Sequence, residues 1–301
     1  MRDVSKLCFA PMVVVALVLS FARNTFGATL IDDFDRNNST IVGAASAIPS
    51  LLWDERLANG SPEIPSDTVR IVNNQLYIGN SHLVGGSGTG TSNGYAELGP
   101  FPTDLKVAFD LDFGPITSSD ASGSFQRWGT ETQIQLRHPD NGMMAGSALP
   151  AGSVAVSFYP NGNMHVRSAS SAGLLDDRFY DFAGILQSGN GSHDTDPDTS
   201  YTMTGSHTIK MSLIGDALEI FVDDLNLPKV STAISTSVPK LTTNQIALGK
   251  FLRTSSGVEA RYDPRFDNLT IDFPLQLVVD RQTGGMTLQG ATDAATGILG
   301  Y

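Results

Sequence analysis

Cysteine is almost absent from this 301-residue chain, since Cys8 is the only one. The chain therefore cannot close an internal disulfide or bind a metal through a cluster of thiolates. Basic residues are also scarce: 19 Lys and Arg stand against 31 Asp and Glu, so the formal net charge is -12. Nucleic-acid binding needs a basic surface, so nucleic acid is excluded as the natural partner.

Helical periodicity is lacking as well, and the 30 Gly and 15 Pro favour turns. Short segments with alternating apolar and polar residues recur instead between residues 29 and 273. In the clearest one, residues 105–113, Val107 and Phe109 fall on one face while Lys106 and Asp110 fall on the other. Residues 130–137 alternate in the same way. This pattern predicts an all-β fold.

Turn signals separate these segments. Asn73-Asn74, the Pro-Asn-Gly-Asn of residues 160–163 and the Ile-Gly-Asp of residues 214–216 each stand between two strand segments. Such residues adopt the backbone conformations of tight turns, so each predicts a β-hairpin. Residues 29–273 are numerous enough for one large two-sheet sandwich with its own core.

One long apolar run occurs, at residues 7–22, after the basic residues Arg2 and Lys6 and before the small residues Gly27 and Ala28. This order is typical of an export signal, so the mature protein is predicted to be secreted or to lie at the cell surface. The alternative is a membrane anchor, but the run is shorter than the ~20 residues that a helical span needs. We therefore expect no membrane span after signal removal.

The sequence predicts three parts. Residues 1–27 are a signal peptide and residues 28–273 are the sandwich domain. Residues 274–301 are a short β-hairpin tail or a truncated second unit, because they are too few to bury a core of their own.

Several segments resemble the concanavalin A-like, or laminin G-like, jelly roll of secreted bacterial proteins. They are residues 30–36, 72–78, 207–224 and 266–271. The resemblance implies a two-sheet antiparallel jelly-roll sandwich in which the first and last strands pair. It also implies a concave sheet that serves glycans in lectins, glycosidases and polysaccharide lyases. The tail from Leu275 is similar to units of bacterial exported proteins that carry a Pro-Glu-Pro sorting tag.

Hydrolysis by a retaining glycosidase needs two carboxylates about 5–5.5 Å apart. In the glucanase branch of the family they belong to a Glu-x-Asp-x-x-Glu motif on one strand face, and this sequence lacks that motif. Its nearest substitute is Asp110 with Asp112, which share a strand face at roughly 7 Å. A solvated strand face explains this pair more simply than catalysis does.

A polysaccharide lyase needs a group that neutralises the substrate carboxylate and a general base. Alternation over residues 130–137 places polar side chains on one face, and further polar residues follow in nearby strands. The lyase candidates are Gln133, Gln135, Arg137, Tyr159 and His165. The simpler interpretation is a polar outer sheet face.

Glycan binding without catalysis relies on aromatic platforms beside polar groups. Trp128 is the main candidate, because it stands between polar residues in a predicted loop; Tyr95 is a further aromatic candidate, whereas Trp53 is predicted in the core. The predicted ligand-binding residues are Trp128, Arg127, Glu131 and Tyr159.

Calcium is the only cofactor that the sequence suggests; no organic cofactor is expected. Because the resemblance puts the first and last strands together, their carboxylates are candidate ligands of a structural ion. These are Asp32, Asp33, Asp35 and Asp267. An alternative is the loop with Asp194, Asp196 and Asp198, although it lacks the glycine and the final glutamate of a calcium loop.

Together these features predict a secreted, non-catalytic glycan- or surface-binding jelly-roll module, with a polysaccharide or cell-surface glycan as its partner. One alternative is a polysaccharide lyase or hydrolase that acts on the concave sheet. The other is a structural cell-envelope or adhesion protein.

Overall fold

The computed structural model describes residues 29–45, 48–57, 68–79, 94–115, 117–118, 130–139, 149–160, 162–181, 184, 186–189, 205–240, 244–252, 260–272, 276–279 and 286–289. Every regular element among these residues is a β-strand. The described part contains no helix that is long and apolar enough to cross a membrane. The chain divides into two units, Thr29–Asp272 and Met1–Ala28 with Phe273–Tyr301.

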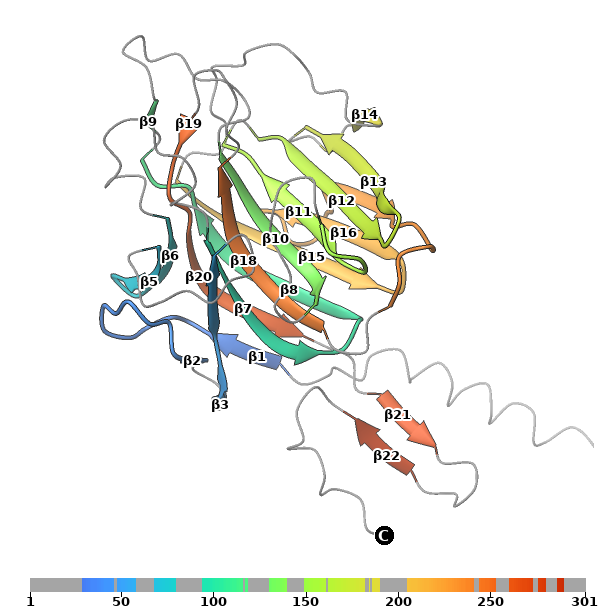
Figure 1. The fold of residues 1–301 in the computed structure, drawn as a ribbon, viewed down its shortest axis with the longest axis horizontal. Coiled ribbons are helices and arrows are strands. Elements are labelled where there is room, and N and C mark those ends of the chain that lie inside the picture. The colour runs from blue at the N-terminus through green and yellow to red at the C-terminus, as the bar shows by residue number, and fades with distance from the viewer. Residues whose placement is uncertain are drawn as a thin grey trace, which may run out of the picture. The chain divides into compact units, whose positions relative to one another are not determined.

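One eight-stranded sheet of the larger unit is centred on β8, and we call it the β8 sheet (Figure 1). Its order is β17 (Val230–Ala233), β16 (Ala217–Val222), β15 (Ser206–Ile214), β8 (Leu105–Asp112), β20 (Arg265–Asp272), β6 (Gln75–Ile78) and β5 (Val69–Val72). The eighth strand, β1 (Thr29–Asp32), pairs antiparallel with β20, with Ile31 opposite Thr270. The expected pairing of the first strand with the closing strand is therefore confirmed.

The second eight-stranded sheet is centred on β10, and we call it the β10 sheet. Its order is β14 (Leu186–Gly189), β13 (Gly173–Tyr180), β12 (Met164–Ser170), β11 (Val154–Phe158), β10 (Thr130–His138), β18 (Asn244–Leu252), β7 (Gly94–Phe101) and β4 (Asp54–Leu57). The two antiparallel sheets lie one behind the other in Figure 1 and form a jelly-roll sandwich, which confirms the predicted fold class.

Three smaller strand pairs accompany the sheets. They are β2 (Ala44–Ala45) with β3 (Ile48–Leu52), β9 (Thr117–Ser118) with β19 (Ala260–Arg261), and, in the second unit, β21 (Gln276–Val279) with β22 (Met286–Gln289). The last pair is antiparallel, with Leu277 opposite Leu288, so the tail contains the hairpin that its sequence pattern predicts.

The core lies between the two sheets, and alternation selects its side chains. Along β8 the buried residues are Val107 and Phe109 and their alternate neighbours, while the residues between them are exposed or half-buried. Ile134 and Leu136 of β10 are fully buried, as are most apolar residues of the strands around them. The predicted alternation of residues 105–113 is thus confirmed.

Two of the predicted turns show the backbone that their residues favour. Asn73 and Asn74 have φ values of 52° and 62° and connect β5 to β6. Gly215 has a φ of 59° and connects β15 to β16. The first turn has positive φ at both central residues, and the second has it at its first central residue, Gly215. Both patterns match the right-handed twist of a hairpin, so these predicted hairpins are confirmed.

Candidate functional site

Polar side chains cover the face of the β10 sheet that points away from the core, and we call this surface the polar face. It includes Asp54 and Arg56 of β4, Tyr95 and Glu97 of β7, Glu131, Gln133, Gln135 and His138 of β10, Ser157 of β11, His165 and Arg167 of β12, and Asp177 of β13. On the central strand β18, the small residues Ala247 and Gly249 stand between Glu97 and Tyr95 on one side and Gln135 and Gln133 on the other.

Most of the polar face is buried, although a polar outer face is normally solvated. Glu131, Gln133 and Gln135 are each 0% exposed, and His165 and Arg167 are only 2% and 1% exposed. This surface therefore differs from an ordinary outer sheet face in that its side chains are buried. Side chains of this kind need hydrogen-bond partners to be stable there.

A buried ion pair lies on the β11–β12 side of the polar face. The Oε2 atom of Glu131 accepts hydrogen bonds from Arg167 at 2.7 Å and from the hydroxyl of Ser157 at 2.9 Å. The same arginine nitrogen donates to Ser157 at 2.8 Å. Glu131, predicted as a ligand-binding residue, is thus already paired with a cation within the sheet.

A chain of hydrogen bonds runs from this ion pair along β10. The side-chain amide of Gln133 lies 3.5 Å from the hydroxyl of Ser157, and the side chain of Gln135 donates to Oε1 of Gln133 at 3.0 Å. Oε1 of Gln135 lies 2.6 Å from Nδ1 of His138. Gln133 and Gln135, predicted to share a face, therefore lie together in one continuous network.

His138 extends the network across β18 to the next strands. Its Nε2 atom lies 3.1 Å from Glu97, and its ring meets the edge of Tyr95 with 5.4 Å between ring centroids. Glu97 in turn lies 3.4 Å from Arg56, which also pairs with Asp54. The network thus spans β10, β7 and β4.

A β-bulge in β10 brings His138 to this face. Gln135 is opposite Ala247 and His138 is opposite Gln245, so β10 advances by three residues while β18 advances by two. Strict alternation would send residue 138 into the core, and one extra residue reverses that. Sequence reasoning missed His138 because it assumed strict alternation over residues 130–137.

The same bulge removes Arg137 from the polar face, so its predicted place on one face with Gln133 and Gln135 is wrong. Its φ is 54°, and its guanidinium donates to the carbonyl oxygens of Thr103, at 3.1 Å, and Gly215. Both acceptors flank strands of the β8 sheet. Arg137 therefore joins the two sheets and does not contact Gln133 or Gln135 in any hydrogen bond of the described network.

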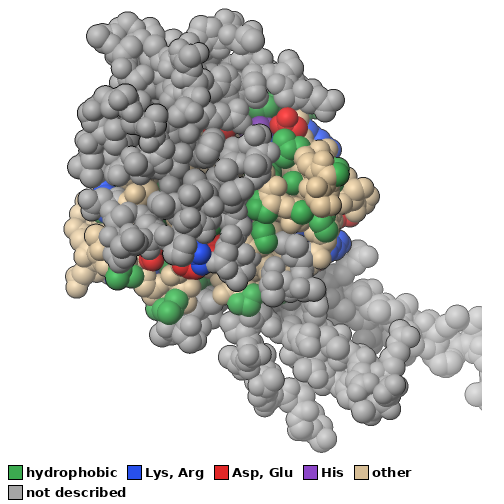
Figure 2. Space-filling view, in the orientation of Figure 1, with side chains coloured by type: hydrophobic (Ala, Val, Ile, Leu, Met, Phe, Trp, Pro, Cys, Tyr) green, Lys and Arg blue, Asp and Glu red, His purple; other side chains and the backbone are tan. Residues whose placement is uncertain are grey.

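His165 forms a second polar pair at the β13 side of the face. It stacks on Phe179 with 3.7 Å between ring centroids, and its Nε2 atom bonds to Asp177. Burial disfavours the charged imidazolium more than Asp177 favours it, which lowers the pKa of His165 from 6.5 to about 4. His165 is therefore neutral near pH 7. Figure 2 shows acidic, basic and histidine side chains at the surface beside β13.

The aromatic candidates within the described ranges, Tyr95, Tyr159 and Trp53, are not exposed platforms. Tyr95 and Tyr159 are 0% and 1% exposed, and Trp53 is 4% exposed, as its predicted place in the core requires. Arg127 and Trp128 lie outside the described residues, as do Asp194, Asp196 and Asp198 of the alternative calcium loop.

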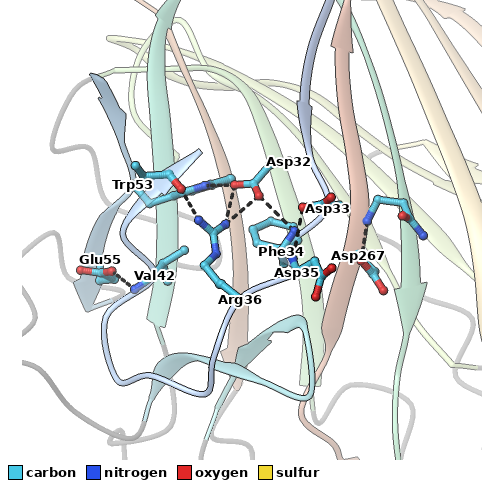
Figure 3. Close-up of polar contacts among 11 residues, drawn as sticks. Asp32, Asp33, Phe34, Asp35, Arg36, Val42, Trp53, Glu55 and Asp267 are labelled. Atoms are coloured by element: carbon cyan, nitrogen blue, oxygen red, sulfur yellow. Dashed lines mark hydrogen bonds and ion pairs between the residues drawn. The ribbon is translucent and has the colours of Figure 1, made fainter. Parts of the chain in front are cut away.

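Asp32, a predicted calcium ligand, is fully buried and faces Trp53 rather than Asp267 (Figure 3). Its two oxygens accept hydrogen bonds from Arg36, each at 2.7 Å. The indole of Trp53 donates to it at 2.7 Å, and the backbone N–H of Phe34 donates at 3.0 Å. The carboxylate of Asp32 therefore connects Arg36, Trp53 and the backbone of Phe34 at the end of β1.

The other calcium candidates lie near the outer face of the β8 sheet. Asp267 is directly opposite Asp110 in the pairing of β20 with β8. Burial raises the pKa of Asp267, and the charges of Asp110 and Asp33 raise it further. In the described ranges no group of three or more His, Cys, Asp or Glu side chains is arranged to hold a metal. Calcium binding stays a prediction.

Two pairs of carboxylates can be compared with the pair that glycoside hydrolysis needs. Asp110 and Asp112 share a face, as expected, but Asp110 accepts hydrogen bonds from Thr208 and Asn268, and Asp112 accepts one from Gly114. On the polar face, two strand spacings and four residues separate the backbones of Glu131 and Glu97. Strand geometry puts them roughly 16 Å apart. Glycosidases use separations of about 5–9.5 Å.

The spacing of the polar residues on β10 is informative. Gln133-x-Gln135-x-x-His138 has the spacing of the glucanase motif Glu-x-Asp-x-x-Glu. On a regular strand the first and last of these positions face opposite sides, and the bulge lets them share one. The three positions carry two amides and an imidazole in this chain, whereas the motif with the same spacing carries three acidic residues.

No protein-family model matches the chain, and no curated protein is similar to it in sequence. Similar folds occur among solved structures of glycoside hydrolases. A Bacillus licheniformis beta-glucanase matches with a TM-score of 0.48 and 8% identity over 83% of this chain and 100% of that chain. LamAcat of Zobellia galactanivorans matches with a TM-score of 0.46 and 11% identity over 84% and 99%. Beta-agarase B of Zobellia galactanivorans matches with a TM-score of 0.45 and 10% identity over 80% and 91%.

Proposed function

We propose that this chain is a secreted or surface-held, non-catalytic glycan-binding module whose binding site is the polar face. The observation that carries the proposal is the row of Gln133, Gln135 and His138 in one hydrogen-bonded network. Amide and imidazole groups supply both donors and acceptors, which is what sugar hydroxyls require. The export-signal pattern of residues 1–27 supports a location outside the cell.

The chemistry of these side chains argues against hydrolysis at this row. A glutamine can neither protonate a leaving oxygen nor attack an anomeric carbon, which are the two tasks of the carboxyl pair in a glycosidase. The carboxylates of the polar face are engaged elsewhere, because Glu131 pairs with Arg167 and Glu97 lies beside Arg56 and His138. The described residues of this face therefore favour binding over cleavage.

Because the row is buried, association of a sugar with it should be slow. Gln133, Gln135 and His138 are each 0% exposed, so a sugar reaches them only when this face becomes accessible. Binding that requires a conformational change is slower than simple docking. Slow association that becomes independent of ligand concentration at saturation is therefore expected, and diffusion-controlled association would place the binding site elsewhere.

The experiment is a panel of soluble polysaccharides, with a neutral β-glucan, an agarose oligosaccharide and a polyuronate as probes. Each is tested with the wild-type chain for binding by calorimetry and for cleavage by new reducing ends and unsaturated products. The variant Gln133→Ala/Gln135→Ala tests the site, and Gln75→Ala on β6 of the other sheet is its matched control.

The outcomes separate the functions. Binding without cleavage, weakened in the double variant and retained in Gln75→Ala, supports the proposal. Unsaturated products would support a lyase, and new reducing ends without them would support a hydrolase; either would overturn the non-catalytic function. If the chain neither binds nor cleaves any of the polysaccharides, the proposal is overturned in favour of a structural envelope or adhesion protein.

A further inference from the structure

Arg137 has an unusual backbone for its place inside a strand. Its φ of 54° lies in the left-handed region, although it is not a glycine and its side chain is 0% exposed. That conformation is unfavourable for an L-residue with a side chain, so it persists only where surrounding contacts hold it.

The contacts that hold it come from the other sheet. The Nε atom of Arg137 donates to the carbonyl oxygen of Thr103 at 3.1 Å, and Nη2 donates to the carbonyl oxygen of Gly215. Nη2 also lies 3.6 Å from Asp104, whose carboxylate accepts the backbone N–H of Gly215 at 2.9 Å. Asp104 thus ties the arginine and the β15–β16 turn into one cluster.

The bulge offers a choice between two arrangements of β10. In the observed one, His138 contacts Gln135 and Glu97 on the polar face while Arg137 points to the β8 sheet. In a regular strand the two residues would exchange sides. The contacts of Arg137 with Thr103, Gly215 and Asp104 exist only in the observed arrangement, so they favour it.

We infer that Arg137 is a positioning residue of the polar face: by holding the bulge, it places His138 in the hydrogen-bonded row. It acts through the backbone, because its side chain lies on the opposite side of the sheet from that row. The effect on glycan affinity rests on the proposed function, whereas the effect on His138 does not.

The test uses the full chain and two substitutions. Arg137→Gly removes the anchor but accepts a positive φ without strain, and Arg137→Lys keeps the charge but loses the planar fork that reaches two carbonyl groups. Arg178→Ala is the control, since Arg178 of β13 also donates across the sandwich, to Thr232 and to Ala233, but at no bulge in β10.

The first readout is the pair of ring signals of His138 in NMR spectra, assigned with His138→Gln. We expect Arg137→Gly to shift both signals, Arg137→Lys to shift them less, and Arg178→Ala to lower the melting temperature without shifting them. Unchanged His138 signals in a folded Arg137→Gly protein would overturn the inference. If that variant does not fold, unchanged signals in Arg137→Lys would overturn it equally.

The second readout is affinity for whichever polysaccharide of the panel binds the wild-type chain. Loss of the His138 contact should weaken binding about tenfold in Arg137→Gly, the equivalent of one hydrogen bond, and Arg178→Ala should bind like the wild type. Unaltered affinity in Arg137→Gly would overturn the role in binding. A wild-type chain that binds no glycan overturns the proposed function alone, because the His138 signals still test the positioning.

Discussion

The indole N–H of Trp53 donates to the carboxylate of Asp32 across 2.7 Å, although the two residues are 21 positions apart in the chain. Arg36 bonds to both oxygens of the same carboxylate. Asp32 therefore holds the segment after β1 and the tryptophan before β4 at one end of the sandwich. Because Asp32 is buried, its loss should lower the stability of the fold, since the groups that donate to it cannot turn to water.

Replacement of Asp32 by asparagine should destabilise the chain by about 3 kcal/mol, because it leaves the guanidinium of Arg36 facing an amide. The free energy of unfolding in urea is the measurement. Asp33→Asn is the matched control: Asp33 is exposed, and its contact with the backbone N–H of Asp35 is local, so we expect a change within about 0.5 kcal/mol. Equal effects of the two substitutions would contradict the role of Asp32.

Much of the fold could be predicted from local pattern. Alternation in residues 105–113 identifies the buried side of β8, and Asn73-Asn74 identifies a turn, because both depend on neighbours in sequence. The pairing of β1 with β20 came from the family resemblance, since residues so far apart leave no local signal.

Two features of the polar face, the bulge and the burial of its side chains, could not be predicted from local pattern. Alternation correctly grouped Gln133 with Gln135. It also placed Arg137 on that face, where the structure has His138 instead. The bulge depends on Thr103 and Gly215, which belong to distant parts of the chain. Period-2 alternation also says which side chains share a face without saying whether water reaches that face. The burial of the row could therefore not be read from the sequence.

Gly79 should be intolerant of any side chain. Its φ is +120°, and a Cβ atom would lie 2.2 Å from Asp263 and 2.8 Å from Lys250. Those two residues form a buried ion pair at 2.7 Å. Gly79→Ala would have to displace one partner, so we expect a loss of about 3 kcal/mol or more in the free energy of unfolding.

Gly173 is the matched control for this substitution. Its φ of +119° is nearly the same, but a Cβ atom there would meet nothing within 4 Å. Gly173→Ala should therefore cost only the backbone strain, about 1 kcal/mol. If both alanine variants unfold at the same urea concentration, contact with the Lys250–Asp263 pair is not what excludes a side chain at residue 79.

His165 should make the chain less stable as the pH falls. Burial lowers its pKa from 6.5 to about 4, so between these values the unfolded chain binds a proton that the folded chain does not. Stability from this group is complete above the ordinary value and is lost progressively toward pH 4, by up to about 3 kcal/mol. Urea unfolding across this pH range, with NMR titration of the ring, measures both effects.

The variant His165→Gln should flatten the part of the pH profile that belongs to this group. His207→Gln is a suitable control, since His207 at the start of β15 in the other sheet pairs with Asp223, which is exposed. An NMR titration of His165 near the ordinary histidine value would contradict the burial argument directly, whatever the stability curve shows.

Asp267 tests the calcium prediction. Burial and the charges of Asp110 and Asp33 raise its pKa, so at neutral pH the folded chain carries an ionised carboxylate that its surroundings disfavour. Asp267→Asn removes this repulsion and should raise the melting temperature slightly in the presence of a chelator.

A bound calcium ion would make the wild-type chain the more stable of the two, because the ion offsets the repulsion only where Asp267 is present. Calcium chloride should therefore raise the wild-type melting temperature and leave that of Asp267→Asn unchanged, with magnesium chloride as the control for ionic strength. A wild-type melting temperature that responds equally to both salts would show that these carboxylates hold no calcium.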